Sequence, residues 1–225
     1  TIVKSLLTEY DTSSGEQLVK TFDLYIVSTE SAFKIENCHI NSGDFVFELN
    51  GPLTLTVSGQ GEKLTRVGDS TYTVPGSVVS SSATYTPTTP VLDVEIGGTD
   101  VPNLVNATLA VQNNTKFKGY DTLQDSLSVT NNTNAMYPSG FFLEDRVVSG
   151  NITQFLTSNN SSSFFDFSTN SNITIKTLLN GGTFFQAALT GCMFTKRIQV
   201  GEAFQDVIDF RLTSSPANLN TIITY

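Results

Sequence analysis

Short segments in which apolar and polar residues alternate run through most of this chain, and this feature most constrains its fold. Alternation with a period of two places one face of a β-strand in a core. Residues 45–49 and 53–57 show it on either side of Asn50-Gly51, a dipeptide that tolerates positive φ, so we predict a β-hairpin there. Further strands are predicted at residues 21–28, 91–96, 104–112, 126–130, 147–155, 173–178, 184–189 and 222–225.

Helix signals are scarce. Residues 161–166 fit one short helix with an Asn or Ser cap. Residues 202–212 fit either a helix or a strand, and we favour the strand because of the repeat described next. Charged residues make up only 15% of the chain, well below the usual quarter, while Ser, Thr and Asn are plentiful. Thr in particular suits extended strands, so the sequence predicts an all-β fold with at most one short helix per domain.

Two stretches of the chain repeat the same order of features. Residues 33–57 and residues 185–212 each contain an aromatic-led strand, a Cys, a polar interval with Gly, and an alternating strand. The spacing from the Cys to the last strand agrees to within a residue. We therefore predict two tandem domains of β-sandwich or barrel-like form, covering residues 1–90 and 91–225. The Pro- and Ser-rich residues 74–90 would be the linker.

The net charge of −9 and the pI of about 4.4 disfavour tight, sequence-reading binding to duplex DNA. Such a charge would suit a surface past which a polyanion slides, or it would simply keep the protein soluble. No apolar run approaches the roughly 20 residues of a membrane span. The first residues do not form a signal peptide, and there is no initiator Met. We expect the chain to begin inside a longer protein or to have lost its front.

Nothing in the sequence predicts a catalytic residue, a metal ligand or a cofactor site. His39 is the only histidine, which rules out a three-His zinc site, and its neighbour Cys38 should point to the other side of a strand. We interpret His39 as structural, partly buried or exposed. We interpret Cys38 and Cys192 as buried thiols without a disulfide, because equivalent positions in two domains would lie too far apart.

Three other patterns have a weak functional interpretation. Residues 59–63 lack the spacing and the helix of a phosphate-binding loop, and a strand-ending turn is favoured. The carboxylate pairs Asp93/Glu95 and Glu144/Asp145 could be hydrolase acids, but solvated faces are favoured. Asn-x-Ser/Thr triplets suggest glycosylation in a secreted protein, although chance in a chain this rich in Asn, Ser and Thr is favoured. Their Asn residues are Asn106, Asn113, Asn131, Asn151, Asn159, Asn160 and Asn172.

Four segments, taken in order, resemble the tail tube protein of tailed bacteriophages, in its long type with two tube domains. Residues 127–138 are similar to its strand with paired Asn and a Pro-containing loop, and residues 145–156 contain its Arg-x-x-Ser-Gly strand. Residues 192–212 resemble its two closing strands. Residues 38–61 end in Ser-Gly-x-Gly, with Val57 where the family often has Trp. The resemblance covers the chain from about residue 21 to its end.

This resemblance implies a structural protein of the virion rather than an enzyme, with no cofactor. Subunits would pack against copies of themselves in stacked rings, three subunits giving a pseudo-hexameric ring, and sheath or other tail proteins would be further partners. Genomic DNA would pass through the lumen without specific binding, and assembly would take place in the host cytoplasm, with no membrane. The first domain would lack N-terminal strands that are not in this chain.

The long polar segments 121–125 and 151–163 are candidates for the loops that contact neighbouring subunits or rings. The residues singled out are Asp121, Asp125, Asn151, Asn159 and Ser162. The alternative function is a secreted or surface β-sandwich, such as an adhesin or carbohydrate-binding protein. A third reading is a sheath or baseplate component with a related fold.

Overall fold

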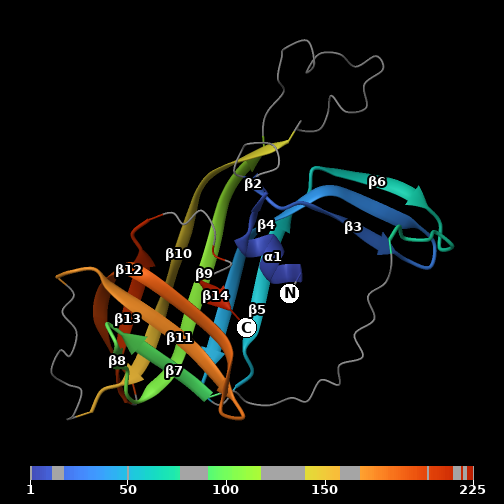
Figure 1. Cartoon of the computed structure of the whole chain (residues 1–225). Coiled ribbons are helices and arrows are strands. Elements are labelled where there is room, and N and C mark those ends of the chain that lie inside the picture. Colours follow the sequence, from blue (N-terminus) through green and yellow to red (C-terminus); the bar gives the residue numbers. More distant parts are fainter. Residues whose placement is uncertain are drawn as a thin grey trace. The chain divides into compact units, whose positions relative to one another are not determined.

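The computed structural model describes residues 2–11, 18–49, 51–76, 91–117, 140–157, 168–201, 203–214, 219 and 222–224. These residues form one short helix and strands that are almost all antiparallel partners of one another, which confirms the all-β prediction (Figure 1). The elements are α1 (Ile2–Thr8), β1 (Tyr10–Asp11), β2 (Leu18–Val19), β3 (Phe22–Val27), β4 (Ala32–Glu48), β5 (Thr54–Gln60), β6 (Lys63–Gly68), β7 (Val91–Ile96), β8 (Thr99–Asp100), β9 (Leu104–Phe117), β10 (Phe141–Phe155), β11 (Ser171–Leu179), β12 (Gly182–Val200), β13 (Phe204–Leu212) and β14 (Ile223–Thr224).

Apart from the small β1–β2 ladder, the described strands pair in the order β3-β4-β9-β10-β13-β12-β11-β7-β8. Strands β5 and β6 also pair with β4, and β14 pairs with β12. The chain divides into two compact units. Unit 1 comprises residues 1–41, 58–86 and 113–145, and unit 2 comprises residues 42–57, 87–112 and 146–225. The tandem domains expected from the repeat stay a prediction.

Each unit has its own core. In unit 1, Leu7, Val19 and Ile40 are buried around the paired strands. In unit 2, the Phe185 ring lies 5.2 Å from the rings of both Phe45 and Phe47, and Leu109, Ile152 and Ile208 are also buried. In unit 2 the buried residues alternate along β4 from Gly43 to Phe47 and along β12 from Phe185 to Leu189, as the sequence pattern predicted.

Most predicted strands are confirmed, several with longer bounds. In the segment predicted at 202–212, Phe204–Leu212 forms a strand, β13, and the predicted strand at 104–112 extends to Phe117 as β9. The hairpin partners at 45–49 and 53–57 lie in β4 and β5, which pair with each other. The predicted strand at 126–130 and the predicted helix at 161–166 lie outside the described residues.

The Gly-x-Gly of residues 59–61 lies where β5 ends, which fits the strand-ending turn that the sequence favoured. A Cβ on Gly59 would lie 2.5 Å from the backbone oxygen of His39, and one on Gly61 would lie 2.2 Å from the Ile35 side chain. Both glycines are therefore needed where β5 and the following residue pass close to β4. No phosphate-binding geometry is needed to explain them.

Helix α1 was not anticipated from the sequence, because it carries no acidic residue in its first turn and no basic residue in its last. Tertiary contacts hold it instead. The buried Asn113 side chain donates to the backbone oxygens of Leu7 and Ile40, both at 3.0 Å, and so ties α1 to β4.

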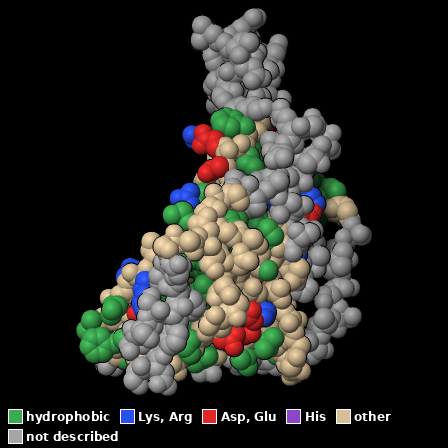
Figure 2. Space-filling view, turned by 60° about the vertical axis from the view of Figure 1, so that its left-hand side comes forward, with side chains coloured by type: hydrophobic (Ala, Val, Ile, Leu, Met, Phe, Trp, Pro, Cys, Tyr) green, Lys and Arg blue, Asp and Glu red, His purple; other side chains and the backbone are tan. Residues whose placement is uncertain are grey.

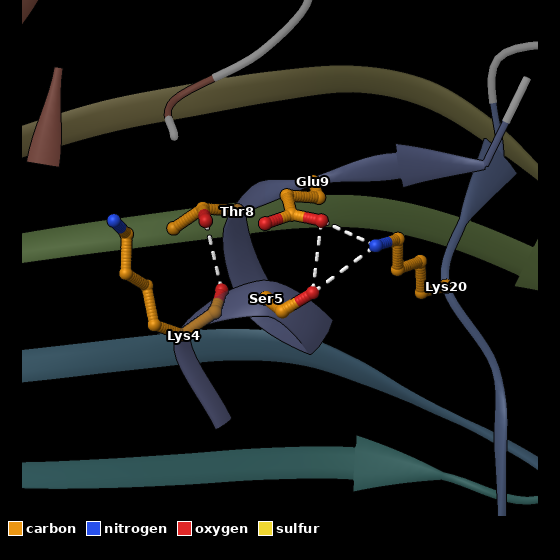
Figure 3. Close-up of polar contacts among 5 residues, drawn as sticks. All are labelled: Lys4, Ser5, Thr8, Glu9 and Lys20. Carbon is orange, nitrogen blue, oxygen red and sulfur yellow. Dashed lines mark hydrogen bonds and ion pairs between the residues drawn. The ribbon is translucent and has the colours of Figure 1, made fainter. Parts of the chain in front are cut away.

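The residues around the end of α1 form a small polar network (Figure 3). The Thr8 hydroxyl donates to the Lys4 oxygen at 2.8 Å, and the Ser5 hydroxyl donates to the Glu9 carboxylate at 2.9 Å. Lys20 donates to Ser5 at 3.1 Å and also pairs with Glu9. The hydrogen bond from Lys20 is the main cause that lowers the pKa of Glu9. The network stabilises a seven-residue helix that its own sequence would not hold.

The two long strands β4 and β12 carry the same irregularity at the same place. In β4, Cys38 pairs with Phe22 of β3, and the next pair is Ile35 with Leu24. In β12, Cys192 pairs with Ser171 of β11, and the next pair is Leu189 with Ile173. The residue just before each Cys has positive φ, 49° at Asn37 and 78° at Gly191. Such a β-bulge is a specific local feature, so its recurrence supports the repeat seen in the sequence.

Candidate assembly edges

Strand β5 presents an unprotected edge. It pairs with β4, and no other described strand pairs with it. All its residues are exposed, including the apolar Leu55 and Val57. Its sequence contains no charged residue and no Pro, the usual devices that keep an edge strand from pairing with another chain.

Strand β12 presents a second edge over Lys196–Val200. Strand β11 pairs with β12 only as far as Cys192, where β13 begins to pair on the opposite side. From Lys196 to Val200, β13 is the one described strand that pairs with β12. Because antiparallel hydrogen bonds alternate, the other side of these residues carries backbone groups that no described strand satisfies.

The register identifies which backbone groups point to this edge. The Thr213 amide donates to the Gly191 oxygen at 3.3 Å, which makes residue 191 and every second residue after it face β13. The backbone groups of Lys196, Ile198 and Val200 therefore point to the open side. Their side chains share one face of the sheet, on which Ile198 is 60% and Val200 71% exposed.

The charges beside the β12 edge are neutralised within the molecule. Lys196 Nζ lies 2.8 Å from an oxygen of the fully buried Asp206, and Arg197 Nε lies 3.5 Å from Asp209. An edge lysine normally repels a second strand, but this one is engaged with β13. On the face drawn in Figure 2, uncharged polar side chains and backbone predominate, and hydrophobic side chains gather at the lower left.

The carboxylate pairs singled out in the sequence lie in different surroundings. Asp93 and Glu95 of β7 lie close to Asp100, and Lys176 pairs with Glu95 at 2.5 Å and with Asp93 at 3.9 Å. Its hydrogen bond to Glu95 is the main cause that raises the Lys176 pKa. Because Lys176 pairs with two of the three carboxylates, we interpret the cluster as a surface ion-pair network.

The second pair, Glu144 and Asp145, is also engaged on the surface. Lys116 donates to Glu144 at 2.6 Å, and the Asn114 side chain donates to Asp145. These interactions fit the solvated face that the sequence favoured over a pair of hydrolase acids.

His39 is structural, as expected, but more buried than expected. Its Nε2 lies 2.9 Å from the Thr115 hydroxyl, which itself donates to Asn41, so the ring donates from Nε2. Its ring stacks on Phe141 with centroids 4.1 Å apart. Burial lowers the pKa of His39 and keeps the imidazole neutral.

The cysteines are buried and form no disulfide, which confirms their interpretation as core thiols. Burial raises the pKa of both thiols, that of Cys192 to about 11. A thiol with such a pKa is a poor nucleophile at neutral pH.

Of the residues predicted to contact neighbouring subunits, Asn151 is the one within the described part of the chain. It lies inside β10, where it pairs with Asp209. Its backbone N–H donates to the Thr108 hydroxyl at 3.1 Å. Asp121, Asp125, Asn159 and Ser162 lie outside the described residues.

Four of the Asn residues in triplets that resemble glycosylation signals lie in the described part of the chain, and Asn106 and Asn151 are half-buried in β9 and β10. Asn113 is buried with its amide hydrogen-bonded, so no glycan fits there, whereas Asn172 is exposed. Among the described helices, none is long and apolar enough to cross a membrane.

Both open edges and their apolar side chains are features that the sequence alone did not single out. The signal was present in the alternating apolar residues of 53–57 and 192–200, but such residues were expected to face a core.

The model of the Bacteriophage Baseplate Tube Protein Family matches residues 7–225. No curated protein matches the chain.

Proposed function

Because this chain belongs to the bacteriophage baseplate tube protein family, and is thus a structural protein of a phage tail, we propose that it assembles with its own copies into the rings of a tail tube. The match over nearly the whole chain is the observation that carries this proposal. The rings would stack around a lumen through which the genome passes into the host, in contact with sheath or other tail proteins.

Open sheet edges support self-assembly. A strand edge that is exposed, apolar and without gatekeeper charges is a ready template for pairing with another strand. Strand β5 has these properties, and in the Lys196–Val200 part of β12 the exposed apolar residues stand beside two cations that pair with Asp206 and Asp209. A contact between two different surfaces repeats from copy to copy, and closes into a ring when the rotation allows it.

The repeat supports a ring of three subunits with pseudo-sixfold symmetry. The matching bulges at Cys38 and Cys192 fit two related halves in one chain. Three such chains would place six related elements around the axis. The net charge of −9 suits a lumen wall that repels DNA and lets it slide.

Electron microscopy of negatively stained protein tests the proposal, together with sedimentation over a range of protein concentrations. We expect rings or hollow rods, with a mass that rises in multiples of three subunits. Dispersed monomers at every concentration would refute it. An intact mass that includes glycans would instead favour the secreted adhesin or carbohydrate-binding protein.

A further inference from the structure

We propose that subunits join when the open edge of β12 in one copy pairs with the open edge of β5 in a second copy. This inference rests on the proposed self-assembly, and goes beyond it by naming the two strands. Lys196–Val200 forms one side of the contact and Thr54–Val57 the other. The partner is a second copy of this chain.

The repeat shows what the β12 edge lacks. When every second residue is counted from the equivalent bulges, β4 has one extra residue after Ile40. The series in β4 is Cys38, Ile40, Gly43, Phe45 and Phe47, and the series in β12 is Cys192, Phe194, Lys196, Ile198 and Val200.

The equivalent segment of β4 is fully paired. Gly43, Phe45 and Phe47 lie opposite Val111, Leu109 and Ala107 of β9. The Leu49 amide donates to the Val105 oxygen at 3.2 Å, and alternation from this pair makes Gly43, Phe45 and Phe47 face β9. Lys196, Ile198 and Val200 point their backbone groups to the corresponding side of β12. The backbone groups of Lys196, Ile198 and Val200 are therefore oriented to form hydrogen bonds with one more strand, as those of β4 do with β9.

The exposure of the side chains agrees with this comparison. Phe45 and Phe47 are 5% and 1% exposed, whereas their equivalents Ile198 and Val200 are among the most exposed apolar residues described. A neighbouring strand with its own apolar side chains would cover them. Leu55 and Val57 on β5 provide such side chains.

The same comparison shows what the β5 edge lacks. Strand β13 follows β12 as β5 follows β4, and β13 pairs with β12 on one side and with β10 on the other. Strand β5 pairs with β4 alone among the described strands. Each of the two edges thus misses the one neighbour that its equivalent in the other half of the chain has.

Charge favours a second copy at these edges. Two molecules that each carry a net charge of −9 repel one another, and this repulsion opposes contact least where carboxylates are absent or paired. Strand β5 carries no charge, and Lys196 and Arg197 are balanced by Asp206 and Asp209. A contact between two different edges is heterologous, as a ring requires.

Two single variants test the inference. Ile198→Pro removes the amide that points to the open edge and leaves the hydrogen bonds to β13 in place. Leu55→Lys puts a charge on the β5 edge. Each variant should raise the protein concentration needed for assembly at least about tenfold, equivalent to about 1.4 kcal/mol. Sedimentation velocity measures this concentration.

Mixing the two variants distinguishes a heterologous contact from a symmetric one. Each variant keeps one intact edge, so an equimolar mixture should form dimers of one Ile198→Pro and one Leu55→Lys chain, visible by mass photometry. A mixture that stays monomeric would overturn the proposal. So would normal assembly by either variant alone, because a heterologous contact needs both edges.

Phe184→Lys is the matched control, because Phe184 is an exposed apolar residue of the same strand, at the bulge between Thr183 and Phe185, both of which pair with β11. It should assemble as the wild type does. A cooperative thermal unfolding transition must show that each variant is folded. If Ile198→Pro is unfolded, Ile198→Lys is tested in its place. Wild-type protein that never assembles would refute the proposed function itself, whereas wild-type rings that both edge variants also form would refute only this inference.

Discussion

Replacing Gly150 by alanine should destabilise the protein strongly. A Cβ at this position of β10 would lie 2.0 Å from the backbone oxygen of Thr108 and 2.5 Å from the Phe210 ring. Contacts below 3.0 Å are not tolerated, and the nearest atom belongs to the backbone of β9, which cannot rotate away as a side chain can. The two strands would have to separate, with loss of packing around Phe210.

The structure gives a magnitude for this loss. Overpacking a core costs about 1–3 kcal/mol, and a clash with backbone places Gly150→Ala near the upper end, at about 3 kcal/mol. For a chain of 150–250 residues, each kcal/mol lowers the midpoint of thermal unfolding by about 2–4 °C. We therefore expect a fall of about 6–12 °C, measured by circular dichroism at a concentration below that of assembly.

Gly182→Ala is the matched control. Its Cβ would lie 3.7 Å from the Leu179 oxygen, an ordinary contact. This variant should stay within about 0.5 kcal/mol of the wild type. If the two alanine variants unfold at the same temperature, the inference that β9 and β10 lie too close at Gly150 for a Cβ is refuted.

Three further predictions concern buried polar groups. Asn113→Ala removes the hydrogen bonds to the backbone oxygens of Leu7 and Ile40 and should lower the free energy of unfolding by about 2 kcal/mol. Proteolysis near α1 should become faster. A urea unfolding curve that does not change would contradict this prediction. Burial lowers the pKa of His39, so the unfolded chain takes up a proton at this residue at a higher pH than the folded protein does. The stability that the neutral, buried ring contributes is therefore complete above pH 6.5 and is lost as the pH falls below it. Urea midpoints from pH 7.5 to 5 should therefore fall more in the wild type than in His39→Phe, and parallel curves would contradict this. The thiol of Cys192, with a pKa of about 11, should react with a thiol reagent at pH 8 only after unfolding. The same raised pKa lowers stability as the pH rises from 9 to 11, and rapid labelling of the folded protein would refute its burial.

The fold class and many strand positions could be predicted because they depend on local patterns. Alternation at 91–96 predicted β7 with the same bounds, and the two-residue period at 204–212 marks β13 once the repeat is considered. The buried thiols followed from their places inside strands. The helix α1 could not be predicted, because contacts outside its own sequence stabilise it, among them one from Asn113, more than a hundred residues away.

The sequence by itself determined which residues alternate, where glycines interrupt the strands, and that two halves of the chain follow one order. Only the tertiary structure decided which alternating strands find a neighbour. Phe45 and Ile198 have the same pattern around them, yet β9 covers the first and no described strand covers the second. The physical reason is that alternation specifies a face and a period, whereas hydrogen-bond pairing depends on which distant segment lies alongside.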